Sequence, residues 1–277
     1  MEKMTKLNFL TAGMPSISKS ALSALDDLKK LNLDGMELEY VHGVRKNLEL
    51  AQEIKKIKQK TDLVLTAHGP YYVNLNATEE LKIKNSVRHI VETAEQASNS
   101  GAFSFTFHAG FYLGTSKEST YKAIKKNLSI AIKKILDKDL KIWIRPETTG
   151  KESQFGNLEE IISLSQELEN VMPCVDFSHL HARYNGKYNT KPEFEEGLNK
   201  IENGLGKEAL NNMHIHLSGI NYTAKGERNH LILKESDMNY KDLLKTLKEY
   251  KVKGALVCES PNIEIDTAIL KKYYSLL

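Results

Sequence analysis

The sequence contains only two cysteines among its 277 residues, and no apolar run approaches the ~18 residues of a membrane-spanning helix. Both cysteines fall in segments expected to be strands. Because side chains alternate across a strand, Cys174 is expected to face the same way as Asp176 and Cys258 away from Glu259, so we expect no disulfide between them. The N-terminus MEKMTKLNFL also lacks the basic and apolar segments of a secretory signal. We therefore expect a soluble, cytoplasmic protein with no membrane partner.

A large excess of charge of one sign is also missing. The net charge of +3 and the pI of about 8.5 permit an anionic partner without requiring one. With 40% hydrophobic and 27% charged residues, the chain is long enough to form one large globular domain or two small ones. Because no domain boundary or low-complexity linker is visible, we expect a single domain that spans residues 1–277.

Strand-like and helix-like segments alternate along the chain. The expected strands are short runs rich in β-branched, aromatic or apolar residues, at 6–12, 35–40, 63–68, 103–108, 141–146, 171–177, 213–218 and 254–260. Longer polar stretches with helical spacing lie between them, such as 16–31, 48–59, 78–100, 117–138, 158–168 and 240–250. Longer polar connections are expected at 150–156, 183–192 and 221–237. Eight strand-helix units in about 250 residues predict an α/β fold, a (β/α)8 TIM barrel.

Metal-capable side chains stand where these apolar runs end. The segments TAHGP, TFHAG, RPETTG, CVDFSH, HIHLSG and VCES supply His68, His108, Glu147, Asp176, His179, His216 and Glu259. The C-terminal ends of parallel barrel strands meet on one face, so residues far apart in sequence can converge there. One such residue is weak evidence for a metal site, but it is improbable that so many would stand at strand ends by accident. The pattern predicts a metal-dependent enzyme.

A mixture of histidine and carboxylate ligands favours zinc or manganese over calcium or a thiolate-bound metal. One candidate position consists of His68, His108 and Glu147, and a neighbouring one of Glu147, Asp176, His216 and Glu259. If the strand ends at Asp176, then His179 can project from the next turn into the same cavity. His214, two residues before His216, is expected to lie deeper on the same side and to support the site rather than to bind metal.

Six motifs, in this order and near these intervals, carry a family resemblance: AHGPYYVNL, FHAG, PETTGKESQFGNLEEI, CVDFSHLHA, HLSG and ESPN. With them the chain resembles the endonuclease IV family of apurinic/apyrimidinic endonucleases, over nearly its whole length. The resemblance implies a xylose-isomerase-like barrel with up to three zinc ions, manganese being possible in some positions. It implies hydrolysis of the phosphodiester 5′ to abasic sites in double-stranded DNA, with Glu147 orienting the attacking hydroxide. We expect the protein to act as a monomer.

The resemblance also implies further site residues. His179 and His230 would hold a third metal, but the family's aspartate two residues before that histidine is replaced here by Arg228, and Glu227 is the available substitute. Tyr71 stands where the family inserts a tyrosine into DNA, and Arg45 is its possible basic counterpart.

Two other functions remain open from the residues. Sugar isomerases and epimerases of the same barrel group also place Glu, Asp, His and Glu at the ends of strands five to eight, and His108, His230 and Tyr71 are what favour the nuclease. A nucleic-acid-binding protein without catalysis would bind abasic DNA with a steep salt dependence and never cut it.

Overall fold

The computed structural model describes residues 3–277 and shows one eight-stranded parallel sheet with the strand order β5-β4-β3-β2-β1-β10-β7-β6. Its strands are β1 (Leu7–Ala12), β2 (Gly35–Glu39), β3 (Val64–His68), β4 (Ser104–Phe107), β5 (Trp143–Pro146), β6 (Cys174–Asp176), β7 (Met213–Leu217) and β10 (Gly254–Cys258). Parallel bridges Ile144–Val171 and Glu147–Cys174 connect the two edges of the sheet. The sheet is therefore a closed barrel, and the TIM-barrel prediction is confirmed.

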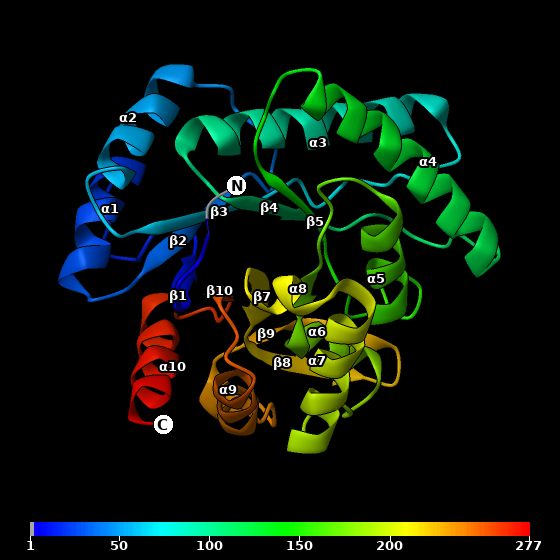
Figure 1. The fold of residues 1–277 in the computed structure, drawn as a ribbon. Coiled ribbons are helices and arrows are strands. Elements are labelled where there is room, and N and C mark those ends of the chain that lie inside the picture. Colours follow the sequence, from blue (N-terminus) through cyan, green and yellow to red (C-terminus); the bar gives the residue numbers. More distant parts are fainter. Residues whose placement is uncertain (1–2) are drawn as a thin grey trace.

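Helices surround the barrel (Figure 1). They are α1 (Ala21–Lys30), α2 (Leu48–Lys58), α3 (Glu80–Ser100), α4 (Lys117–Leu136), α5 (Leu158–Glu167), α6 (Phe177–Arg183), α7 (Lys191–Leu205), α8 (Lys207–Leu210), α9 (Tyr240–Glu249) and α10 (Glu264–Leu276), with a 3-10 turn η1 (Leu233–Glu235). None of the helices in residues 3–277 has the length and apolar character needed to cross a bilayer.

Two expectations about local structure were wrong. The first helix was expected from residue 16 but begins at Ala21, because the Ser20 side chain caps its first turn. The connection expected at 221–237 overlaps an antiparallel hairpin of β8 (Gly219–Thr223) and β9 (Gly226–Leu231), which turns at residues 224–225 before Gly226, whose φ is +91°. A polar hairpin has little of the apolar alternation by which strands are recognised in a sequence.

Apolar side chains fill the space between the strands and the helices. Alternation along β4 directs Phe105 and Phe107 outward into this core, whereas Ser104 and Thr106 face the barrel interior. Inside the barrel, a small apolar cluster that includes Leu10 and Val257 is separate from the two outer clusters. Both cysteines are free, as expected, and the structure shows that both are buried.

Candidate metal centre

Strand alternation places polar side chains inside the barrel at its carboxyl end. On β3, Leu65 and Ala67 pack in the outer core, while His68, the last residue of the strand, is buried within the site. On β7, Ile215 and Leu217 likewise face outward, and His216 lies inside. The site is thus built from strands whose outward residues hold them against the helices.

Glu147 is fully buried directly after β5, at the centre of the cluster. Its Oε2 lies 3.3 Å from Nε2 of His68, and its Oε1 lies 3.5 Å from Nε2 of His108. The backbone N–H of Glu147 donates to Phe107 O at 3.1 Å, which fixes it beside β4. The structure brings together the three residues of the first predicted position at spacings that suit a metal ion.

Asp176 ends β6 and caps α6. Its Oδ1 accepts from the backbone N–H of His179 at 2.7 Å, so both side chains start from one turn, as the sequence predicted. The other oxygen, Oδ2, accepts no hydrogen bond and faces the cluster, 3.2 Å from Nδ1 of His179. One aspartate thus stabilises the helix and offers a ligand atom.

The second predicted position is the quartet of Glu147, Asp176, His216 and Glu259, whose ligand atoms all lie within 4.8 Å of one another. Nδ1 of His216 is 3.4 Å from Glu147 Oε1 and 3.4 Å from Glu259 Oε2. Each member has one buried atom with no hydrogen-bond partner among the described residues: Glu147 Oε1, Asp176 Oδ2, His216 Nδ1 and Glu259 Oε2. Buried polar atoms without partners are costly. One such atom from each of four residues fits the donor set of a divalent cation.

The electrostatics of the cluster also favour a bound cation. Burial raises the pKa of Asp176 to about 6, with Glu259 and Glu147 acting in the same direction against His179. Burial opposes a charge on Glu147 as well, yet His216 and His108 hold the pKa of Glu147 well below its usual range. Crowded carboxylates require positive charge nearby, which either protonated imidazoles or metal ions can supply.

A third group lies beside the quartet, where Asp176, His179 and His230 are close enough to share an ion. Glu227 Oε2 lies 3.6 Å from Nε2 of His179, so the proposed substitute for the family's aspartate does reach this group. Arg228 is exposed.

Two glycines bring Glu227 to this place. A Cβ on Gly150 would lie 2.6 Å from the Cβ of Glu227, and a Cβ on Gly226 would lie 2.3 Å from Gly150 O. The Glu227 backbone N–H donates to Gly150 O at 2.9 Å. The hairpin can approach the loop after β5 only because neither glycine has a side chain.

The two predicted DNA contacts differ in their distance from the cluster. The half-exposed ring of Tyr71 lies 5.3 Å from that of His68 and 6.3 Å from that of His108, at the mouth of the site. Arg45 is exposed after β2 and lines a cavity of about 630 Å³ between the β1 and β2 ends and helices α1 and α2.

The sequence reasoning missed one buried acid, Glu37 on β2. Its Oε2 lies 2.9 Å from Nε2 of His214, and its Oε1 lies 3.1 Å from Nε2 of His216. The alternation in GMELE, with Met36 and Leu38 in the outer core, was the available signal that Glu37 faces inward. As expected, His214 lies deeper in the barrel than His216, where it contacts Glu37.

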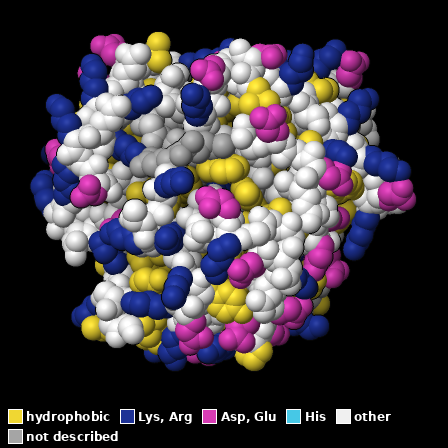
Figure 2. Space-filling model, in the orientation of Figure 1, with side chains coloured by type: hydrophobic (Ala, Val, Ile, Leu, Met, Phe, Trp, Pro, Cys, Tyr) yellow, Lys and Arg dark blue, Asp and Glu magenta, His cyan; other side chains and the backbone are white. Residues whose placement is uncertain are grey.

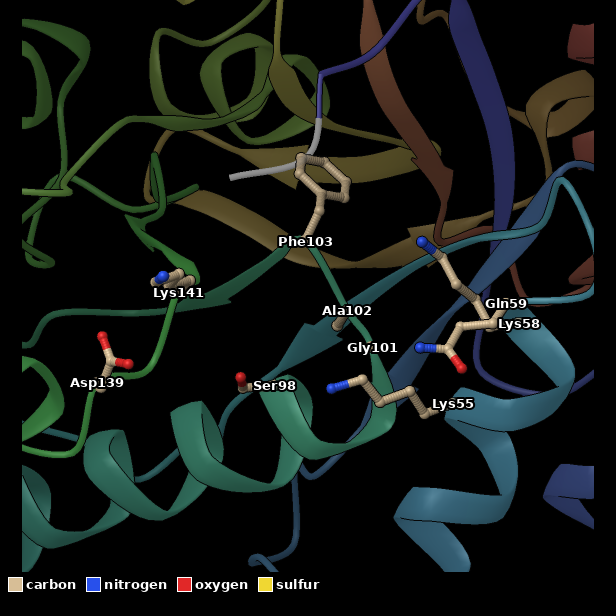
Figure 3. A pocket seen from close by; sticks show the side chains of 9 residues that line it. All are labelled: Lys55, Lys58, Gln59, Ser98, Gly101, Ala102, Phe103, Asp139 and Lys141. Carbon is tan, nitrogen blue, oxygen red and sulfur yellow. The ribbon is translucent and has the colours of Figure 1, made fainter.

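A second hollow, of about 420 Å³, lies at the opposite end of the strands. Figure 3 shows Lys55, Ser98 and Lys141 around it, near Phe103, which directly precedes β4. Figure 2 shows lysine and arginine side chains spread over one face of the molecule among aspartate and glutamate. Barrel enzymes work at the carboxyl ends of their strands, so the metal cluster, not this hollow, is the candidate active site.

These features define a xylose isomerase-like TIM barrel: the family model of that description matches residues 25–273, and the chain belongs to this family. The resemblance inferred from the motifs is thereby confirmed. Along its full length the chain is 46% identical to an uncharacterized protein of Methanocaldococcus jannaschii, also over that protein's full length. It is 28% identical to a probable endonuclease 4 of Aster yellows witches'-broom phytoplasma, over 60% of this chain and 58% of that one.

Two solved structures share the fold at low identity. Endonuclease IV from Thermus thermophilus superposes with a TM-score of 0.74 at 15% identity, over 98% of this chain and 100% of that one. A D-tagatose 3-epimerase-like protein gives the same TM-score at 20% identity, over 96% and 98%. The fold is therefore shared with both an endonuclease IV and an epimerase-like protein.

Proposed function

We propose that this protein is a metal-dependent endonuclease that hydrolyses the phosphodiester 5′ to abasic sites in double-stranded DNA. The observation that carries the proposal is that two further ligand groups lie beside the quartet, one of His68, His108 and Glu147 and one of Asp176, His179 and His230. The similarity to probable endonuclease 4 proteins supports a nuclease. The added ligands His108 and His230, which a one-metal sugar enzyme does not need, support more than one metal position.

Zinc is the proposed metal, with up to three ions per chain and manganese possible in some positions. His68, His108 and Glu147 would hold the first, the quartet the second, and His179, His230 and Glu227 the third. Bound divalent ions would supply Lewis-acid stabilisation of the phosphate and lower the pKa of an attacking water. We propose that the protein acts as a monomer.

The protein's own side chains have separate roles in this proposal. Glu147 lies between two ligand groups and would orient the attacking water through one carboxylate oxygen. Tyr71, half-exposed above His68 and His108, would stack into the duplex where a base is missing. Arg45 would contact a backbone phosphate from the loop after β2.

Incision of a labelled duplex tests the proposal. The duplex carries one tetrahydrofuran abasic analogue, which resists β-elimination, and an intact duplex serves as the control. The proposal requires specific cleavage on the 5′ side with two to three metal ions per chain. Absence of incision by protein with its metals in place would overturn it.

One observation favours a second candidate, a metal-dependent sugar isomerase or epimerase. The cavity beside β1 and β2, of about 630 Å³, is lined by Glu37 and Glu39 and is large enough for a small molecule. A duplex would not need such a cavity. Turnover of a ketose by a protein that holds about one metal ion and does not cut DNA would establish this alternative.

A further inference from the structure

The candidate histidine ligands differ in what holds the ring nitrogen that faces away from the metal positions. Nδ1 of His68 donates to Gly69 O at 2.7 Å, and that of His230 donates to Glu259 O at 3.2 Å. In these two residues a backbone carbonyl orients the ring. The other nitrogen, Nε2, is then left for a metal ion.

His216 is turned the other way. Its Nδ1 faces Glu147 and Glu259, whereas its Nε2 lies 3.1 Å from the carboxylate oxygen Oε1 of Glu37 and 3.3 Å from Nε2 of His214. All of these side chains except Glu259 are fully buried. A carboxylate therefore takes the position that a backbone carbonyl has at His68 and His230.

The neighbours of Glu37 fix where the protons lie. Thr66 Oγ1 donates to Oε2 of Glu37 at 2.8 Å, and Nε2 of His214, 2.9 Å from the same oxygen, is placed to donate as well. Nδ1 of His214 then accepts from the Ser104 hydroxyl at 3.0 Å. Since Nε2 of His214 carries a proton, it cannot accept one from His216. The Nε2 proton of His216 is thus left with a single acceptor, Oε1 of Glu37.

We propose that Glu37 is a positioning residue for the metal centre: it holds the proton of His216 on Nε2 and thereby keeps the Nδ1 lone pair directed at the quartet. A carboxylate partner also makes an imidazole a stronger electron donor to its metal than a carbonyl partner does. His214, Thr66 and Ser104 keep the Glu37 carboxylate in place. This inference rests on the metal binding of the proposed function, and it applies to either reaction.

The same network excludes a competing metal position. Cys174, His214 and His216 lie close enough together to hold an ion deeper in the barrel. With Nε2 of both histidines donating to Glu37, and Nδ1 of His214 accepting from Ser104, His214 has no lone pair left for a metal. We expect Cys174→Ala to retain every metal ion of the wild type.

Metal titration of Glu37→Gln tests the proposal. The substitution keeps the size of the side chain and removes its charge. Loss of a carboxylate partner typically lowers metal affinity about 10–100-fold, and we expect this loss at one position with the others unchanged. Glu249→Gln is the control, because it removes one carboxylate charge from an exposed residue that pairs with Lys191 outside the site. A similar loss in both variants, or none in Glu37→Gln, would overturn the proposal.

A second readout needs neither bound metal nor enzyme activity. A ring N–H of a buried histidine that donates to a carboxylate gives a strongly downfield proton resonance. We expect such a resonance from Nε2–H of His216 in the wild type, and we expect it to disappear in Glu37→Gln. Its absence from the wild type would overturn the proposal even if Glu37→Gln failed to fold. If the wild type bound no divalent ion but showed the resonance, the proposed function would fail and the placement of the proton would stand.

Discussion

Replacement of Glu147 by glutamine should abolish metal-dependent activity and leave the barrel folded. The amide has nearly the size of the carboxylate and can retain the contact with Thr106 Oγ1, which lies 3.3 Å from Oε2. What the substitution removes is the negative charge shared between His68 and His108 on one side and His216 on the other. Two metal positions lose their common ligand at once.

The size of the effect follows from that charge. Unit charges about 4 Å apart attract each other by about 4 kcal/mol at the effective dielectric constant of ~20 that suits protein sites. Each 1.4 kcal/mol is a factor of ten in an equilibrium constant. We therefore expect the metal affinity of Glu147→Gln to fall about 10³-fold, and incision to fall with it.

Metal analysis after dialysis, thermal unfolding and incision of abasic duplex measure the outcome together. Glu249→Gln is the control, because it neutralises an exposed glutamate that pairs with Lys191 outside the site. A Glu147→Gln protein that folds, retains the wild-type metal content and cuts DNA at the wild-type rate would refute the bridging role.

Three further predictions concern the mouth of the site, the third metal group and the proton balance. Tyr71→Ala should weaken binding to abasic duplex more than binding to intact duplex in an electrophoretic or fluorescence assay. Tyr72→Ala, the control, removes an equally exposed ring packed on His89 and should change both affinities to the same extent. Equal losses of both affinities in Tyr71→Ala would exclude insertion of the Tyr71 ring into the duplex. Glu227→Ala should lower the metal content by about one equivalent per chain, since its carboxylate reaches His179, and unchanged metal analysis would reject that ligand. Burial favours the neutral ring of His68, but Glu147 raises the pKa of this ring to about 10 in the metal-free protein. Metal binding near neutral pH should therefore release the extra proton of the His68 ring, and the metal affinity should increase as the pH rises towards 10. Calorimetry in buffers of different ionisation enthalpy measures the release, and zero proton release would contradict it.

The same shift has a consequence for stability. Because the pKa of His68 is higher in the folded, metal-free protein than the ordinary 6.5, its contribution to stability is complete below about pH 6.5 and is lost as the pH rises to about 10. Bound metal replaces the proton and should remove this loss.

The barrel and most of the cluster were predictable because they depend on local patterns. Alternating apolar residues identify each strand, and the position of His68 or His216 at a strand end places it on the carboxyl face without knowledge of any neighbour. Asp176 and His179 were expected to share a turn for the same reason, and the cap that joins them confirms it.

The partners of these residues were not predictable, because they depend on contacts across the barrel. Glu37 meets His214 and His216, far along the chain, and nothing in GMELE specifies that pairing. The position of Glu227 depends on the close approach of Gly150 and Gly226, which only the folded hairpin shows. Such non-local contacts decide which nitrogen of each histidine is free for a metal.

Anomalous diffraction from crystals of the zinc-loaded protein, measured on both sides of the zinc absorption edge, tests the metal centre most directly. We predict one peak within the quartet of Glu147, Asp176, His216 and Glu259 and a second beside His68 and His108, with Glu147 between them. Crystals that contain zinc by fluorescence but show no peak among these residues would contradict the assignment of this site.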